Sequence, residues 1–479
     1  MKLQKRFMAY LYIEFLLCFI IIIAIKLNFF SSLYMLENML GIIIIINYIN
    51  YYFFAAKMQL EILSLSSYFI TFMYLFNLGI PVCRLMNWID SSGETFMNLR
   101  IYIMGITNYI GYLLYAFLLI TFLQIGVLYY HSQKQEKRIP LYKNKIEYNY
   151  ALIKCKNIGF FCILIGILPY ILNEYIYIKD ALRWGYQSVN STNLSGTGIG
   201  LIGNLFLVGY IMLLYAFQHN KKKFDCLFLI LLFYQLFRMY ITGDRSTGIT
   251  LILVIIMIRN KFINKIKRSR IIKYGISGIF ILFLLKIIET SRQLETFTLK
   301  NIIYFFSSNN IIGNTIFGFS NNVWSGMMVR YCMSQVPDYR LGLTYLAAII
   351  GKPLSILNIT DSVWQYAAFS NYINSPERDI LISEIRSAMG GSFSGEIYFN
   401  FGWFGIIIIF FWGYLLAKIS EVSLDGIYSN PTISAFLLYL STLLIWWVRQ
   451  YFTSVSWYSI FYGIVIFMLY HILSIKKRL

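Results

Sequence analysis

Long hydrophobic runs separated by short polar segments extend along most of the chain. A membrane-spanning helix needs about 20 predominantly apolar residues, because that length crosses the hydrocarbon core of a bilayer. By this measure the pattern predicts spans over residues 7–26, 38–56, 62–83, 101–130, 157–175, 197–218, 226–242, 247–258, 274–289, 402–418, 433–448 and 456–474. We therefore expect an all-α, polytopic membrane protein of about 12 transmembrane helices.

The longest polar stretch, residues 290–401, lies between predicted helices 9 and 10 and is too polar to cross a membrane. It mixes an apolar helical run, LTYLAAIIG, with helix breakers such as VPDY and MGGSFSG. We therefore expect an ordered extracytoplasmic loop subdomain that lies on the membrane surface. The chain then divides into residues 1–289 with helices 1–9, the loop at 290–401, and residues 402–479 with helices 10–12.

The composition excludes an ordinary soluble enzyme. Hydrophobic residues make up 58% of the 479 positions and charged residues only 13%, which is typical of a polytopic membrane protein. The net charge of +20 would suggest a nucleic-acid partner in a soluble protein, but here Lys and Arg lie between hydrophobic runs and report topology. We expect membrane lipids, and no nucleic acid, as partners. The basic start and the apolar run at 7–25, without a small-residue cleavage site, predict a first span rather than a removed signal peptide.

The distribution of basic residues predicts which side of the membrane each loop faces. Cytoplasmic loops carry an excess of Lys and Arg, and 25 of the 41 basic residues fall at the termini or in loops on the same side as the termini. Seven lie in the long loop, which the rule leaves out because long segments translocate regardless of charge, and nine lie elsewhere. We therefore expect a multi-pass protein of the cytoplasmic (inner) membrane with both termini in the cytoplasm and the long loop outside.

Several kinds of site lack their residues on the predicted outer side. All three histidines, His131, His219 and His471, fall on the predicted cytoplasmic side. The six cysteines show no close paired spacing, and no glycine-rich nucleotide-phosphate motif is present. We therefore expect neither a metal site nor a cofactor.

Arginines are the main charged residues of the predicted outer side. Guanidinium groups bind phosphate oxygens in pairs and stay charged at any working pH, so several at a membrane surface suit a lipid pyrophosphate. The alternative is contact with lipid headgroups or salt bridges within the loop. The arginines in question are Arg238, Arg245, Arg292, Arg330, Arg340, Arg378, Arg386 and Arg449.

Two short segments combine such an arginine with a carboxylate. GDRSTG at 243–248 is a tight turn between two predicted spans, and its Asp244 can simply pair with Arg245. In RSAMGGSFSGEIYFNFGWFG at 386–405, the glycines allow close backbone approach to a ligand, and Glu396 can accept a proton from a sugar hydroxyl. The alternative for Glu396 is an ordinary loop-to-helix transition, with the carboxylate solvated or paired with an arginine.

The layout and these two motifs resemble the Wzy family of O-antigen and capsular polysaccharide polymerases. The resemblance covers the architecture of the whole chain, with GDRSTG at the outer end of a middle span and the long loop closing on SFSGEIYFNFGWFG. Some members of that family have outer-loop arginines followed by glycine after ten or fifteen residues. Here Arg340 is followed by Gly351 and Arg386 by Gly402, both in one loop, whereas the family distributes them over two.

The resemblance implies a membrane glycosyltransferase that moves a growing glycan from undecaprenyl pyrophosphate to a hydroxyl of a new lipid-linked repeat unit. It also implies a chain-length regulator and a flippase as partners, and no nucleotide, because the lipid-linked bond supplies the driving force. On this basis we expect Glu396 as the general base, with Asp244 as the second candidate. We expect the pyrophosphate to be bound by Arg386, Arg340 and Arg245, with Arg292 and Arg449 as further candidates.

Three other functions are compatible with this layout. A flippase for the same lipid-linked oligosaccharide has a similar number of spans, but the chain lacks two similar halves and has a long outer loop that a carrier does not need. An O-antigen ligase resembles the layout too, but depends on an outer-loop histidine that is absent here. A non-catalytic scaffold for envelope assembly would tolerate substitutions throughout the outer loop.

Overall fold

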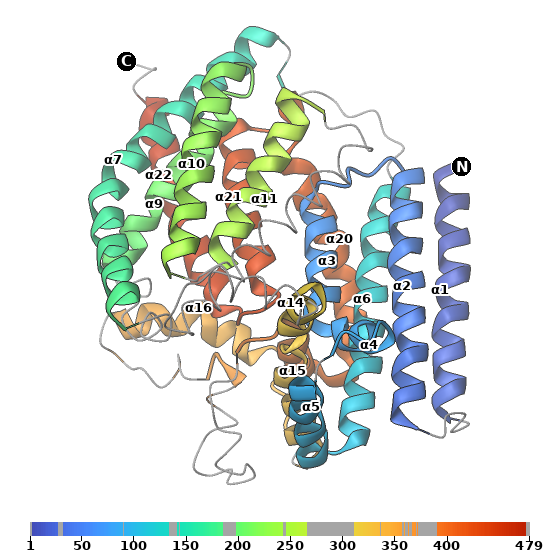
Figure 1. The fold of residues 1–479 in the computed structure, drawn as a ribbon. Helices are drawn as coiled ribbons and strands as arrows, with labels where there is room; N and C mark the ends of the chain where they lie inside the picture. Colours follow the sequence, from blue (N-terminus) through green and yellow to red (C-terminus); the bar gives the residue numbers. More distant parts are fainter. Residues whose placement is uncertain are drawn as a thin grey trace, which may run out of the picture. The chain divides into compact units, whose positions relative to one another are not determined.

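The computed structural model describes residues 2–26, 32–89, 91–133, 144–184, 198–242, 246–265, 311–335, 337–356 and 390–475, together with positions 141, 142, 359, 363, 366–369 and 371. Every regular element within these ranges is a helix (Figure 1). The all-α prediction is therefore confirmed.

The chain divides into two compact units, each built from segments far apart in the sequence. Unit 1 comprises Met1–Glu136, Asn309–Lys418 and Trp447–Trp457, and unit 2 comprises Lys137–Ser308, Ile419–Trp446 and Tyr458–Leu479. The helices of unit 1 are α1 (Lys2–Lys26), α2 (Leu33–Lys57), α3 (Leu65–Asn77), α4 (Gly79–Leu85), α5 (Ser91–Met104), α6 (Ile106–Ser132), α14 (Ile311–Ser320), α15 (Val323–Gln335), α16 (Leu343–Ile356), α19 (Phe393–Phe401) and most of α20 (Gly405–Ser423). The helices of unit 2 are α7 (Lys145–Trp184), α9 (Gly198–Ala216), α10 (Lys221–Thr242), α11 (Ser246–Ile258) and most of α21 (Pro431–Trp447) and α22 (Thr453–Ile475).

Eight helical segments in the described part of the chain are long and apolar enough to cross a membrane. They are Leu3–Ile25, Leu33–Lys57, Ile106–Ser132, Lys145–Arg183, Gly198–Ala216, Lys221–Thr242, Phe393–Ser423 and Thr453–Leu473. The helices α3 and α4 pass the same test together but are bent by 64°, as in a broken span or a re-entrant loop. The predicted span at 274–289 lies outside the described residues, so the count of about 12 spans stays a prediction.

In unit 1 the long helices α1, α2 and α6 are neighbours (Figure 1), and α6 also meets α20 at a very close crossing. A Cβ atom on Gly126 would lie 2.1 Å from the carbonyl oxygen of Phe410, and one on Gly413 would lie 2.3 Å from that of Leu123. Only glycine fits at such distances. Small residues of this kind let membrane helices approach closely, and the resulting van der Waals contact holds the helices together in the absence of a hydrophobic driving force. The crossing fixes α20, and hence the end of α19, against α6.

The bend between α3 and α4 follows from local sequence and from packing. Pro81 stands in the first turn of α4, where a missing backbone N–H costs little. Gly79 lets α14 approach, because a Cβ atom there would lie 1.9 Å from Oγ of Ser320. That hydroxyl donates to the carbonyl oxygen of Leu75 at 3.0 Å. The predicted single span at 62–83 is therefore two helices.

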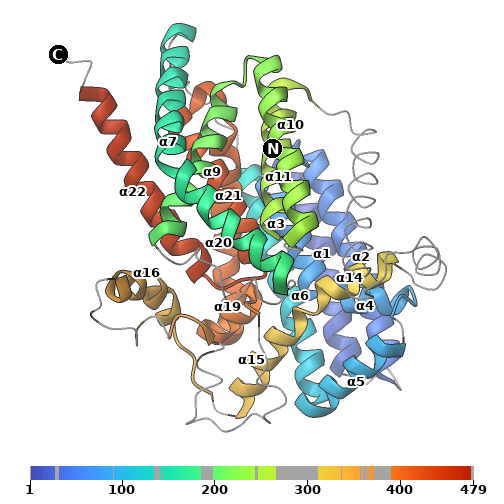
Figure 2. The same cartoon turned by 60° about the vertical axis from the view of Figure 1, so that its left-hand side comes forward.

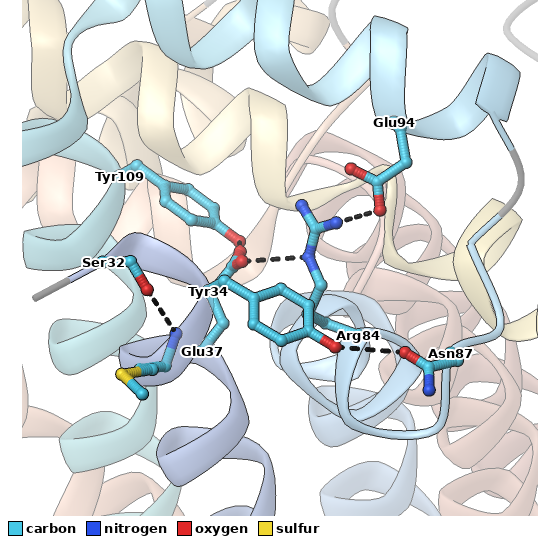
Figure 3. A network of polar contacts seen from close by, with 8 residues as sticks. Ser32, Tyr34, Glu37, Arg84, Asn87, Glu94 and Tyr109 are labelled. Atoms are coloured by element: carbon cyan, nitrogen blue, oxygen red, sulfur yellow. Dashed lines mark hydrogen bonds and ion pairs between the residues drawn. The ribbon is translucent and has the colours of Figure 1, made fainter. Parts of the chain in front are cut away.

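A polar network in unit 1 ties α2, α4, α5 and α6 together (Figure 3). Nε of Arg84 lies 3.1 Å from Oε2 of Glu37, and Nη1 of Arg84 bonds to Oε1 of Glu94. The hydroxyl of Tyr109 donates to Oε1 of Glu37 at 2.6 Å. Arg84 and Glu37 are both buried, so each charge depends on its partner.

Arg84→Met is expected to lower the free energy of unfolding by about 3–5 kcal/mol, because it leaves Glu37 as an uncompensated buried charge. Denaturant unfolding of the detergent-solubilised protein measures the change. Arg449→Met is the matched control, since this arginine is exposed and its loss should change the same quantity by less than about 0.5 kcal/mol. Equal stability of the two variants would contradict a structural role for the network.

In unit 2, α7 and α9 lie side by side (Figure 2), and α10 is joined to α7 by an ion pair. Nε of Arg238 on α10 lies 2.8 Å from Oε2 of Glu174 on α7. The hydroxyl of Tyr234 donates to the same oxygen at 2.8 Å. Arg238, one of the candidate outer arginines, thus has a carboxylate partner and a place in helix packing.

Candidate functional site

The segment from Ser392 to Gly402 forms a buried helix rather than a surface loop. The side chain of Ser392 caps α19 by accepting the backbone N–H of Gly395 at 3.3 Å. The helix ends at Gly402, whose φ of +54° favours glycine. The predicted span starts at residue 402. The structure instead has one apolar segment, Phe393–Ser423, which includes a 3-10 turn at Gly402–Phe404, because FSGEIYFNF is apolar enough to be buried.

Two glycines of the 386–405 motif, Gly391 and Gly395, serve packing within the chain. A Cβ atom on Gly391 would lie 2.3 Å from the carbonyl carbon of Gln450. The amide of Gly395 is already bonded to Ser392, and a Cβ atom there would lie 3.2 Å from Cα of Gly326 on α15. The close approach that these glycines allow is therefore an approach to neighbouring backbone.

Glu396 is held on both carboxylate oxygens. Nε1 of Trp447 donates to Oε2 at 2.9 Å, and the backbone N–H of Phe452 lies 3.1 Å from each oxygen. The residue is only 1% exposed. These hydrogen bonds are buried and join residues about fifty positions apart, so Glu396 fixes α19 to the 447–452 segment. The predicted general base thus lies where both of its oxygens are already hydrogen-bonded.

The C-terminal end of α19 is joined to the segment before α16. The backbone N–H of Arg340 donates to the carbonyl oxygen of Phe399 at 3.2 Å, and that of Leu341 to the carbonyl oxygen of Asn400 at 2.8 Å. The side chain of Asn400 accepts the N–H of Gly342 at 3.1 Å and donates to Oγ1 of Thr344 at 2.6 Å. These bonds hold Arg340 beside the end of α19, where a positive charge complements the helix dipole.

Arg340 lines a small pocket. The other residues that line this pocket are Leu343, Thr344, Tyr366 and Phe399. The guanidinium lies 3.2 Å from Asp338, and both side chains are partly exposed to solvent. A guanidinium beside aromatic and aliphatic side chains is suited to bind a molecule in which a charged group adjoins an apolar one.

Arg330 on α15 is the other arginine beside α19, and its surroundings are aromatic. Its guanidinium carbon lies 5.8 Å from the ring centroid of Tyr398 and 5.4 Å from that of Trp403. Nε and Nη1 are buried and have no hydrogen-bond partner among the residues that the structure describes, although the residue as a whole is partly exposed. Gly111 on α6 makes room for it, because a Cβ atom there would lie 2.3 Å from Nη2. Buried donors without acceptors are costly, so this guanidinium is suited to receive an anion.

A hydroxyl and amide cluster holds the other end of α19. The hydroxyls of Tyr112 and Ser394 both donate to Oδ1 of Asn77, at 2.8 and 2.5 Å. All three residues are buried and join α6, α19 and α3. Because these groups satisfy one another, the cluster is a structural support for the site.

Of the other predicted site residues, only Arg449 belongs to the part of the chain that the structure describes. Arg449 lies in the 447–452 segment, exposed, with its guanidinium carbon 5.9 Å from the ring centroid of Phe76. Asp244, Arg245, Arg292 and Arg386 lie outside the described residues. The structure therefore brings together Glu396, Arg340 and Arg330 around α19. Arg330 is one of the predicted outer arginines but is not among those expected to bind the pyrophosphate. Its signal in the sequence is a single charge within the apolar helix VWSGMMVRYCM.

Within the described ranges, no three His, Cys, Asp or Glu side chains gather where they could hold a metal ion. The side chains described around α19 include guanidinium groups, hydroxyls and aromatic rings. Such a set fits phosphate oxygens and sugar rings.

Comparison with known proteins places the chain in a family. Residues 8–478 match the family described as O-antigen polysaccharide polymerase Wzy. An uncharacterized protein of Methanocaldococcus jannaschii is 29% identical over 259 residues, which cover 50% of this chain and 65% of that protein, slightly less than two thirds of its length. No solved structure matches the chain. Since the family match extends over nearly the whole sequence, the chain belongs to the O-antigen polysaccharide polymerase Wzy family.

Proposed function

We propose that the chain is a polymerase that joins undecaprenyl-pyrophosphate-linked oligosaccharide repeat units into O-antigen or capsular polysaccharide at the outer face of the cytoplasmic membrane. Membership of the Wzy family supports the polymerase role. The observation that supports a site for this reaction is that Nε and Nη1 of Arg330 are buried and have no hydrogen-bond partner within the described ranges. A pyrophosphate would supply the acceptors that this arginine lacks.

The reaction breaks the bond between the anomeric carbon of the growing glycan and the pyrophosphate oxygen. A hydroxyl of the new repeat unit forms the glycosidic bond and gives up its proton to a base, and undecaprenyl pyrophosphate leaves. Arg330 and Arg340 would stabilise the charge that develops on the leaving group. Arg386, Arg245 and Arg292, with Arg449, are proposed as further contacts of the same kind.

The role of Glu396 follows from its hydrogen bonds. With both oxygens occupied by Trp447 and Phe452, it is better suited to hold α19 in position than to take a proton. We therefore propose it as a positioning residue, in place of the general base expected from the sequence. Asp244 then becomes the first candidate for the base. Alignment of the reacting groups depends on such support, since a shift of about 1 Å can cost about 100-fold in rate.

The size of the surface glycan tests the proposed function. In a deletion strain we expect the polysaccharide ladder to be lost on a gel while a single repeat unit is still displayed, and the wild-type gene should restore the ladder. Loss of all surface glycan, with lipid-linked single units trapped inside the cell, would contradict the proposal and indicate transport. We also propose a chain-length regulator and a flippase as partners of this protein.

A further inference from the structure

The helix α16 has its large aliphatic side chains on the outside and its small ones on the inside. Leu343, Leu346 and Ile350 are 58%, 51% and 43% exposed, whereas Ala347 and Ala348 are 8% and 0% exposed. A helix on a water-soluble surface shows the opposite arrangement, with polar residues outward. A contiguous exposed apolar face marks contact with an apolar partner.

The inner face of α16 is fixed, so the outer face cannot turn inward. Ala347 and Ala348 pack with Ala367 in one cluster, against Phe452. Oγ of Ser456 donates to the carbonyl oxygen of Ala348 at 3.2 Å. The exposed leucines and isoleucine therefore belong to the folded arrangement.

The direction of α16 matches a helix that lies in a membrane surface. Both views show α16 running across the direction of α2 and α6, the long spanning helices of the same unit (Figures 1 and 2). A helix with one apolar face lies in the interfacial plane of a bilayer, with that face buried at the boundary of headgroups and acyl chains.

A second group of exposed apolar residues is continuous with the start of α16. Leu341, just before α16, and Trp403 and Phe404, just before α20, are all exposed. The 340–342 segment is hydrogen-bonded to residues 399 and 400, so these side chains lie at the same end of α20. Exposed aromatic residues at the end of a span are typical of the membrane–water interface.

We propose that α16 is an interfacial helix, immersed in one leaflet of the bilayer through Leu343, Leu346 and Ile350, which places the Arg340 pocket at the level of the lipid phosphates. The occupant of the apolar face is the acyl-chain region of the leaflet. Leu343 belongs to both the exposed face and the pocket wall, so the pocket opens toward the leaflet. A lipid-linked pyrophosphate would then reach Arg340 by lateral diffusion; this consequence rests on the proposed function.

Depth-dependent fluorescence quenching tests the position of α16. Single labelling sites are made as Leu346→Cys and Ile350→Cys in the full chain, after Cys18 and Cys226 are replaced by serine, because the other four cysteines are buried. The protein is placed in phosphatidylcholine–phosphatidylglycerol vesicles with nitroxides on the acyl chains. We expect quenching at both positions to reach at least half of the value at an exposed position in the α20 span.

The reference positions are Phe411→Cys, exposed on α20, and Lys222→Cys, exposed at the basic start of α10. Quenching at 346 and 350 as weak as that at 222 would overturn the proposal. A label at Tyr366→Cys, in the pocket wall, should be quenched more strongly by headgroup nitroxides than by acyl-chain nitroxides. The reverse order would show that the pocket does not lie at the phosphate level.

Leu346→Asp tests the access route separately. It should raise KM for the lipid-linked donor at least tenfold with kcat nearly unchanged, whereas Leu346→Ile should leave both unchanged. An unchanged KM, with the labels quenched as expected, would overturn the access route and leave α16 in the leaflet. Absence of any polymerase activity in the wild-type protein, with the labels quenched, would overturn the proposed function alone.

Discussion

Arg330→Met should abolish chain extension without lowering the stability of the protein. Nε and Nη1 of this arginine are buried without acceptors in the described part of the chain, so the folded protein without substrate carries the cost of their desolvation. Replacing the guanidinium removes that cost and, in the proposed reaction, the contact with the leaving pyrophosphate. We expect a loss of about 100- to 1000-fold in rate, as for removal of one transition-state donor. Glycan extension and the free energy of unfolding are measured on the same preparation.

Comparison with Arg84, a buried arginine that has carboxylate partners, makes this result specific. Arg84 has Glu37 and Glu94 as partners, so its loss should destabilise the protein. Arg330 has aromatic rings around it, which contribute about 0.5–2 kcal/mol each at most. Arg330→Lys keeps the charge but not the paired geometry, and should recover only part of the rate. An Arg330→Met protein that extends glycans normally would rule out Arg330 as a substrate contact.

Glu396→Gln should lower stability and chain extension together. The amide oxygen can replace Oε2, which accepts from both Trp447 and Phe452, but the amide NH2 then replaces Oε1 and stands as a donor against the N–H of Phe452. We expect the free energy of unfolding to fall by about 1–3 kcal/mol, the cost of a buried unsatisfied group. Denaturant unfolding measures this change, and kcat for extension is measured beside it.

A double-mutant cycle separates the positioning role of Glu396 from a role as general base. Trp447→Phe removes the indole donor, and Glu396→Gln combined with Trp447→Phe should cost less stability than the sum of the single variants, by at least about 0.5 kcal/mol. A general base would behave otherwise: Glu396→Gln would lose kcat at unchanged stability. That outcome would restore the assignment expected from the sequence.

The apolar runs predicted helices well because length and hydropathy are local properties. The first and last predicted spans, 7–26 and 456–474, correspond to α1 and α22 within a few residues. The predicted span at 62–83 is divided because the bend depends on contact between Gly79 and Ser320, which are far apart in the sequence. Hydropathy alone carries no information about such a contact.

The candidate site was partly predictable, and its geometry was not. Glu396 and Arg340 stood out as charged residues of the outer segment. The burial of Glu396 depends on Trp447 and Phe452, some fifty residues further on. The place of Arg340 likewise depends on residues 399 and 400. The sequence around Arg330 only weakly marks it as a site residue, because it lies in neither a turn nor a glycine motif.

Reconstitution with a defined lipid-linked substrate tests the central claim most directly. The purified protein in vesicles receives undecaprenyl-pyrophosphate-linked repeat units, and glycan length and released undecaprenyl pyrophosphate are measured together. We predict a ladder of products and one released undecaprenyl pyrophosphate for each unit joined, and we predict that Arg330→Met forms both about 100- to 1000-fold more slowly. Movement of the substrate across the vesicle membrane without extension, or equal extension by the wild-type and Arg330→Met proteins, would contradict the account.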